Sequence, residues 1–119
     1  MSLLGRLFGG VPSVSAGEAR ELLDAGAVMV DVRTTKEWNA GHCAFALHLA
    51  LDQLSQKQRR IPQNKKVVVV CRSGNRSRGA TKQLVAAGYD AVNLSGGMNA
   101  WQRSGESLVD RSGKPGRVT

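Results

Sequence analysis

A run of four valines, Val67 to Val70, restricts the folding of this chain more than any other segment. Valine is apolar and β-branched, so an uninterrupted run predicts a β-strand that is buried on both faces. The strand ends at Cys71, and a segment of helical character begins at Ser77. The residues between them, Arg72 to Arg76, must therefore turn the chain tightly from a buried strand into a helix.

Strand and helix patterns alternate along the rest of the sequence. Short apolar runs are followed by segments with helical spacing, capping residues at their starts and glycines at their ends. Strands are expected at 11–14, 27–32, 44–49, 66–70 and 91–94, and helices at 16–25, 36–40, 51–60, 77–87 and after Gly97. Alternation with short connections predicts an α/β fold with a mostly parallel sheet and helices on both faces.

The length of 119 residues supports one hydrophobic core and not two. We expect an N-terminal arm at 1–10, one domain at 11–105 and a flexible C-terminal tail at 106–119 that belongs to no core, because this last stretch is polar and contains Gly and Pro. No apolar run approaches the roughly 18 residues that cross a bilayer, so no membrane partner is expected. Two cysteines and no recognisable secretion signal favour the reducing cytoplasm.

The net charge of +8 raises the question of a nucleic-acid partner. The basic residues are scattered along the sequence, however, and neither an aromatic stacking platform nor a basic recognition helix accompanies them. A solvated basic surface that attracts small anions or an acidic protein is the better interpretation. No nucleic-acid partner is predicted.

Cys71 stands where a reactive thiol is expected. In a tight loop the backbone N–H groups of Arg72 to Arg76 can point at its sulfur, and the positive end of the following helix dipole lies beside it. Both features stabilise a thiolate, or an anionic group attached to the sulfur. A free cysteine is often only a small buried hydrophobe, but the adjoining arginines and glycine favour a nucleophile.

Four segments of the sequence together resemble the single-domain rhodaneses, sulfurtransferases that carry a sulfur atom as a cysteine persulfide. They cover about residues 12 to 105 in the order and spacing of that family. The segments are Asp31-Val32-Arg33 with Glu37-Trp38 and Gly41-His42; the loop Cys71 to Ser77; Ala87-Gly88-Tyr89; and Leu94-Ser95-Gly96-Gly97 with Ala100-Trp101 and Gly105. The resemblance implies a rhodanese-like fold of roughly five parallel strands flanked by helices, without a metal or cofactor.

The resemblance also implies a two-step reaction. The catalytic Cys71 thiolate attacks the outer sulfur of a small anionic donor such as thiosulfate, and the persulfide hands that sulfur to cyanide, a thiol or a sulfur-acceptor protein. The loop residues Arg72, Ser73, Gly74, Asn75 and Arg76 are the expected binding site for the persulfide. Their N–H groups stabilise its charge, and the two arginines attract the donor.

Two other functions compete with sulfur transfer. Phosphatases of related fold have five residues between cysteine and arginine, because a tetrahedral phosphate needs a wider cradle. Here four residues separate Cys71 from Arg76, so the cradle is sized for one sulfur atom, which favours sulfur transfer over phosphate or arsenate chemistry. Rhodanese-like domains also occur as inactive interaction or regulatory modules, but that class generally lacks the loop cysteine.

Supporting roles are expected for Asp31, Arg33 and Ser77. Asp31 ends its strand near the loop and is expected to orient a loop arginine by a charge-assisted hydrogen bond. Arg33 either pairs with Glu37 or reaches over the mouth toward an anion. Ser77 opens the helix beneath the loop. Arg76 has a structural role and Arg72 a substrate-contacting role in this interpretation.

Residues 42–46 depart from the family pattern. His42 is interpreted as a packing and turn residue rather than a general base. Where the family usually has an apolar residue followed by Pro-Gly-Ala, this chain has Cys43-Ala44-Phe45-Ala46. Cys43 fills the apolar position in the simpler interpretation; the alternative is a resolving cysteine that forms a disulfide with an oxidised or persulfidated Cys71.

Overall fold

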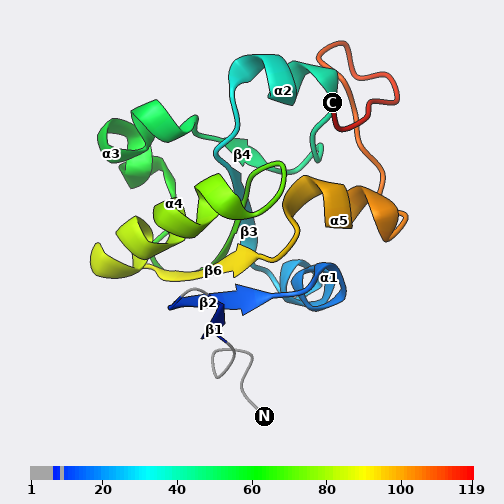
Figure 1. Cartoon of the computed structure of the whole chain (residues 1–119). Helices are drawn as coiled ribbons and strands as arrows, with labels where there is room; N and C mark the ends of the chain where they lie inside the picture. The colour runs from blue at the N-terminus through cyan, green and yellow to red at the C-terminus, as the bar shows by residue number, and fades with distance from the viewer. Residues whose placement is uncertain (1–6, 9) are drawn as a thin grey trace.

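The computed structural model describes residues 7–8 and 10–119, in which six strands form one sheet in the order β1-β2-β6-β5-β3-β4 (Figure 1). The five strands from β2 to β4 run parallel, and the short β1 pairs antiparallel with β2. The strands are β1 Leu7–Phe8, β2 Val11–Val14, β3 Val28–Asp31, β4 Leu47–His48, β5 Lys66–Val70 and β6 Asp90–Leu94. The predicted α/β fold with a mostly parallel sheet of five strands is confirmed.

The valine run forms β5, which lies between β3 and β6. Its valines alternate between two apolar clusters: Val67 and Val69 enter one, and Val68 and Val70 the other. All four are fully buried, as expected for a strand covered on both faces. Because β5 is central, its carboxyl end lies between the carboxyl ends of β3 and β6.

Helices cover both faces of the sheet (Figure 1). Residues of α3 and α4 pack into the cluster with Val67, and residues of α1 and α5 into the cluster with Val68. The helices are α1 Ala16–Asp24, α2 Thr35–Ala40, α3 Leu54–Lys57, α4 Asn75–Ala86 and α5 Gly97–Arg103. Among the described residues, none of the helices has the length and apolar character needed to span a membrane.

Three predicted elements differ from the structure by two or more residues at an end, and the other differences are of one residue. The helix expected at 51–60 is a single α-turn, α3, between two 3-10 turns. Within these turns Leu54 alone is buried and none of the three N-caps makes a side-chain hydrogen bond, so little packing or capping stabilises a longer helix. The strand expected at 44–49 is reduced to β4, since residues 44–45 form a turn. Helix α4 begins at Asn75, two residues before Ser77, because Gly74 completes the turn with a φ of +99°.

Residues 106–119 do not form the expected tail outside the core. Leu108 is 6% exposed and packs into the cluster that contains Trp101. The backbone of Val109 exchanges two hydrogen bonds of 2.9 Å with His42, and the Arg117 N–H donates to Ala40 at 3.0 Å. The segment therefore folds against the end of α2 (Figure 1). Its polar composition concealed the buried leucine and the backbone pairing. Of the predicted arm, residues 1–6 and 9 lie outside the described residues, and Leu7–Phe8 forms β1.

Candidate functional site

Cys71 lies at the carboxyl end of β5, where the loop Arg72–Gly74 leads into α4. The start of α5 holds this loop: the Met98 N–H donates to the Cys71 carbonyl at 2.8 Å, and the Asn99 N–H donates to the Arg72 carbonyl at 3.0 Å. Gly97 permits this approach, because its φ is +57° and a Cβ there would lie 2.7 Å from the Arg72 carbonyl carbon. Gly97 of the Gly96-Gly97 motif therefore belongs to the site and not only to a turn.

The Cys71 sulfur is surrounded by hydrogen-bond donors. The Gly74 N–H donates to Sγ at 3.1 Å, and the Ser77 hydroxyl oxygen lies 3.3 Å away. Burial alone would raise the pKa of the Cys71 thiol, but the Ser77 hydroxyl and the N–H groups of Ser77, Gly74 and Ser73 outweigh it and lower the pKa below its ordinary value. The loop therefore favours the thiolate, as its sequence suggests.

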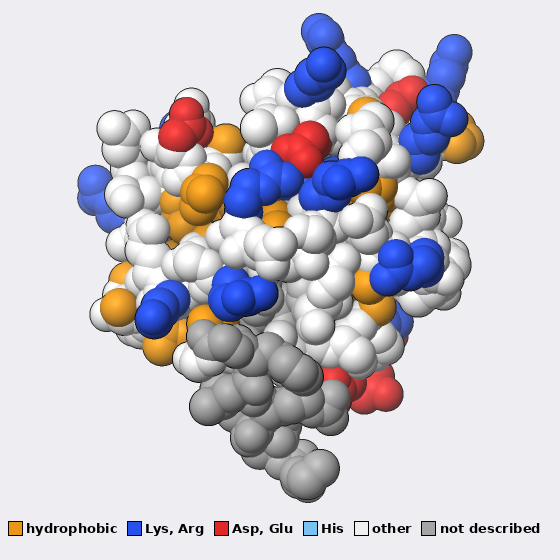
Figure 2. Space-filling model, in the orientation of Figure 1, with side chains coloured by type: hydrophobic (Ala, Val, Ile, Leu, Met, Phe, Trp, Pro, Cys, Tyr) orange, Lys and Arg blue, Asp and Glu red, His pale blue; other side chains and the backbone are white. Residues whose placement is uncertain are grey.

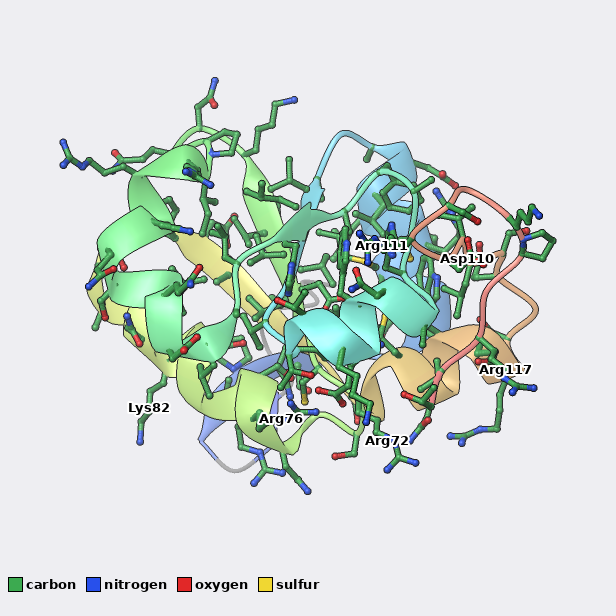
Figure 3. The ribbon with its side chains drawn as sticks, turned by 90° about the horizontal axis from the view of Figure 1, so that it is seen from above. Arg72, Arg76, Lys82, Asp110, Arg111 and Arg117 are labelled. Atoms are coloured by element: carbon green, nitrogen blue, oxygen red, sulfur yellow. The ribbon has the colours of Figure 1, made fainter. Side chains whose placement is uncertain are left out.

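The remaining loop residues face solvent. Arg72, Ser73 and Asn75 are exposed. The Arg72 Nε donates to the Thr119 carbonyl at 2.6 Å, and the Asn75 amide oxygen accepts from Arg78. Figure 3 shows Arg72 and Arg76 on the same side of the molecule. Arg72 thus lies at the rim of the loop, where its charge is accessible to an anion.

Arg76 forms a bidentate ion pair with Glu37 of α2, with two N···O distances of 2.8 Å. Hydrogen bonds from Arg76 lower the pKa of Glu37 to about 2, against the opposing effect of burial and with help from Thr34. Arg76 therefore pairs with Glu37 and not with Asp31, and the expected pairing of the Glu37 carboxylate with Arg33 is wrong. Arg76 ties α4 to α2, which supports its predicted structural role.

Asp31 and Arg33 pair with each other inside the protein. Both side chains are 0% exposed, and the Arg33 Nη2 donates to Asp31 Oδ2 at 2.6 Å and to the Gly41 carbonyl at 2.8 Å. Arg33 therefore does not reach over the mouth, and Asp31 does not orient a loop arginine. The pair braces the turn after α2 instead.

Cys43 and Cys71 are free thiols on opposite faces of the sheet. Cys43 is fully buried with Trp101 and Leu108, and burial, with a contribution from the charge of Asp31, raises the pKa of its thiol to about 12. This placement agrees with the apolar slot in the simpler interpretation. A disulfide with Cys71 would require rearrangement of the sheet, so the structure gives no support to a resolving role.

His42 is committed to packing. Its Nδ1 lies 2.7 Å from the Trp38 carbonyl oxygen, and its ring stacks on Trp38 with centroids 3.7 Å apart. His48, which the sequence analysis did not single out, stacks on the same indole at 4.6 Å. These contacts agree with the predicted packing role.

Asn93 of β6 is a site residue that the sequence analysis missed. Its amide Nδ2 donates to the Gly74 carbonyl at 3.2 Å, and its Oδ1 accepts from the Ser77 hydroxyl at 2.6 Å. The available signal was a polar residue inside the otherwise apolar strand segment Ala91 to Leu94. Asn93 connects the sheet to both sides of the cysteine loop.

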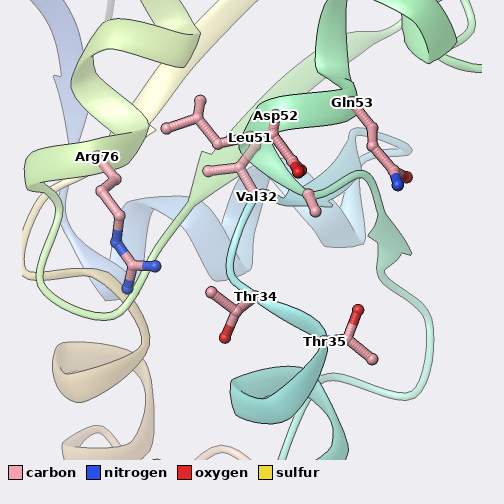
Figure 4. A pocket seen from close by; sticks show the side chains of 8 residues that line it. Val32, Thr34, Thr35, Leu51, Asp52, Gln53 and Arg76 are labelled. Atoms are coloured by element: carbon pink, nitrogen blue, oxygen red, sulfur yellow. The ribbon is translucent and has the colours of Figure 1, made fainter.

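A cavity of about 490 Å³ lies next to Arg76. Figure 4 shows Arg76 at one side of it, with residues 32–35 and the turn at 51–53 around the rest. Its lining is Val32, Thr34, Thr35, Ala50, Leu51, Asp52, Gln53 and Arg76. The cavity is amphipathic and far larger than a single sulfur atom.

The visible surface carries many basic side chains without forming a single patch. In Figure 2, Lys and Arg side chains are spread over the visible face, with a few Asp and Glu between them. In the part of the chain that the structure describes, no three His, Cys, Asp or Glu side chains gather into a metal site. The chemistry visible here is that of one cysteine and its hydrogen-bond donors.

Several solved structures are similar to this chain in fold and sequence. A rhodanese-related protein from Thermoplasma volcanium is 30% identical, with a TM-score of 0.76 over 82% of this chain and 96% of its own. A rhodanese-like domain protein from Staphylococcus aureus is 32% identical, with a TM-score of 0.74 over 83% and 97%. A thiosulfate sulfurtransferase from Pseudomonas aeruginosa is 26% identical, with a TM-score of 0.75; the match covers 92% of this chain but 22% of that protein.

The model of the family described as Rhodanese-like domain matches residues 15–104, which include the whole of β5, the cysteine loop, α4 and α5. With most of the chain matched, and with Cys71 at the end of the central strand, this protein belongs to the rhodanese-like domain family.

Proposed function

We propose that this protein is a sulfurtransferase that moves a sulfane sulfur from a small anionic donor such as thiosulfate to a thiophilic acceptor. The observation that carries the proposal is the surrounding of Cys71 Sγ by the Gly74 N–H and the Ser77 hydroxyl at the N-terminus of α4. The same donors that stabilise a thiolate also stabilise the terminal anion of a persulfide.

The proposed reaction has two displacements. The Cys71 thiolate attacks the outer sulfur of thiosulfate, the S–S bond of the donor breaks, and sulfite leaves with the bonding electrons. The acceptor, which is cyanide, a thiolate or a cysteine of a carrier protein, then attacks the outer sulfur of the persulfide. The Cys71–sulfur bond breaks, and the thiolate is regenerated without a redox cofactor.

Substrate access is proposed to involve the exposed part of the loop. Cys71 is fully buried, so its sulfur meets a donor when the exposed Arg72 and Ser73 move aside. The net charge of +8 attracts the anionic donor, and Arg72 at the rim receives it. The cavity beside Arg76 has room for the body of a larger donor or for an acceptor side chain.

The setting of the reaction is also a proposal. A free, easily ionised Cys71 persists where thiols are kept reduced, which supports the cytoplasm. A protein that accepts the sulfur is a proposed partner, and acidic surface on it would complement the basic face. The named activity of the Pseudomonas aeruginosa relative supports thiosulfate as the first donor to test.

Intact-mass measurement after incubation with thiosulfate tests the function. The reduced protein is expected to gain the mass of one sulfur atom and to release one equivalent of thiocyanate when cyanide is added. Cys71→Ser is expected to gain nothing, whereas Cys43→Ser, the matched control on the other face of the sheet, gains the same adduct. An equal adduct on Cys71→Ser, or none on the wild-type protein with thiosulfate or a thiol persulfide, would overturn the proposal.

A further inference from the structure

Asn93 and Ser77 form a hydrogen-bonded chain that ends at the Cys71 sulfur. All three side chains are buried, with Asn93 4% exposed and the other two 0% exposed. The Asn93 Nδ2 faces the Gly74 carbonyl, which can only accept, so the amide orientation is fixed. Its Oδ1 must therefore face the Ser77 hydroxyl, 2.6 Å away.

The Ser77 hydroxyl has one proton and two acceptors competing for it. The Asn93 Oδ1 is 2.6 Å from the hydroxyl oxygen, whereas the Cys71 Sγ is 3.3 Å from it. A neutral thiol can donate its own proton to the Ser77 oxygen, so that the chain runs from Cys71 through Ser77 to Asn93. An anionic sulfur cannot donate, and the Ser77 proton must then rotate toward it.

We propose that Asn93 is a positioning residue that controls the ionisation of Cys71 by holding the Ser77 proton while the sulfur is neutral and releasing it when the sulfur becomes an anion. The acceptor oxygen of Asn93 thus stabilises the thiol, and the Ser77 hydroxyl stabilises the thiolate and the persulfide. The effect on turnover rests on the proposed sulfur transfer; the effect on ionisation is measured without it.

The charged groups around the loop keep the same partners whether the Ser77 proton points to Asn93 or to Cys71. Arg76 on α4 is paired with Glu37 on α2, Asp31 on β3 is paired with Arg33, and Arg72 lies at the exposed rim. The hydroxyl exchange changes none of these pairs. A shift in ionisation that depends on both Asn93 and Ser77 is therefore assigned to the shared proton.

Two single variants are expected to act in opposite directions. Asn93→Leu removes the competing acceptor, so the Ser77 hydroxyl donates to sulfur at all times and the thiolate forms at lower pH. Ser77→Ala removes the donor, so the thiolate forms at higher pH. Asn93→Leu also removes the bond to the Gly74 carbonyl, which would by itself loosen the loop and act in the direction of Ser77→Ala.

The measurement is the pH dependence of iodoacetamide alkylation, with the Cys71 peptide followed by mass spectrometry. Below the midpoint of the pH profile, Asn93→Leu is expected to react about two- to fivefold faster than the wild-type protein, because a larger fraction of its Cys71 is ionised. The gain stays this small because a thiolate of lower pKa is also less nucleophilic. Adding Asn93→Leu to Ser77→Ala is expected to leave the midpoint where Ser77→Ala alone puts it, or to raise it slightly through the loop.

The control is Thr81→Val, which removes a 2.7 Å bond to the Ser77 carbonyl but not the hydroxyl chain, and its midpoint is expected to match the wild-type value. Asn93→Ala serves in place of Asn93→Leu if the larger side chain prevents folding. A midpoint that rises or stays unchanged in the single Asn93 variants, or that falls equally in the Ser77→Ala background, would overturn the inference. If the midpoint shifts as expected but the protein forms no sulfur adduct, the proposed function is overturned and the inference about Asn93 stands.

Discussion

The charge around Cys71 depends on which carboxylate each arginine meets. Arg33, Arg72 and Arg76 differ in their partners. Arg33 is buried in an ion pair with Asp31 and Arg76 is paired with Glu37, which leaves Arg72 at the exposed rim. Pairing matters for the proposed function, because an arginine held by a carboxylate side chain attracts an anion less strongly than one at the exposed rim. The hydrogen bonds to sulfur, and not a surrounding of free positive charge, are then the main support of the thiolate.

The Glu37–Arg76 pair is expected to give the protein a pH-dependent part of its stability. The folded-state pKa of Glu37 is lowered to about 2 from an unfolded value of 4.5, so the stabilisation is fully present above the unfolded value and is lost as the pH falls toward about 2. Arg76 is partly exposed, and screening by water limits the contribution to about 1 to 2 kcal/mol.

Glu37→Gln tests this pair, because glutamine preserves the capping box with Thr34 and removes the charge. Urea unfolding is expected to show the full loss of stability near neutral pH and a shrinking difference from the wild-type protein as the pH falls below 4.5. Glu21→Gln on the exposed face of α1 is the matched control and is expected to change little. A difference that stays constant through this pH range would contradict the assignment to Glu37.

Patterns within a few consecutive residues are enough to predict most helices and strands, but they do not show which residues of different elements contact each other. The capping box of α1 is contained in four consecutive residues, so the sequence predicts the start of that helix, whereas α2 begins at Thr35, one residue before its predicted start. The valine strand and the position of Cys71 follow from local composition in the same way. The Arg76–Glu37 pair joins residues 39 positions apart, and Asn93 reaches a loop 19 positions away. No local pattern contains such pairings, which is why the partner of Arg76 was misassigned. Arg33 pairs with Asp31 only two positions away, and that choice depends on the burial of both side chains, which local spacing does not show.

The contact between α5 and the cysteine loop is expected to depend on Gly97. Gly97→Ala places a Cβ against the Arg72 carbonyl at a φ of +57°, so we expect a loss of roughly 2 kcal/mol or more in stability and a slower alkylation of Cys71 at neutral pH. Gly79→Ala in the exposed middle of α4 has open space and an α-helical backbone, and it is expected to stabilise the protein by up to about 1 kcal/mol. Thermal unfolding with alkylation rates measures both; equal stability of the two variants would refute the close contact.

The whole molecule is two apolar clusters divided by the sheet, and the segment after α5 completes one of them. The cluster beneath α4 and α3 includes Cys71, and the cluster beneath α1 and α5 includes Cys43 and Leu108. The same segment pairs with His42 and then continues to the carbonyl that binds Arg72. Residues 106–119 therefore connect the core on one face of the sheet to the rim of the site at its carboxyl edge.

Because residues 106–119 complete one apolar cluster, Leu108 is expected to contribute measurably to the free energy of unfolding. Leu108→Ala removes a side chain that is 6% exposed, and the lost burial with the remaining cavity is expected to cost about 2 to 3 kcal/mol in urea unfolding. Val85→Ala is the control, because Val85 is 44% exposed on α4 and its truncation is expected to change stability by less than about 0.5 kcal/mol. Because the segment leads to Thr119, which accepts from Arg72, Leu108→Ala is also expected to increase the hydrogen exchange of the Arg72–Gly74 loop. An unchanged unfolding midpoint would mean that residues 106–119 pack on the fold without supporting it.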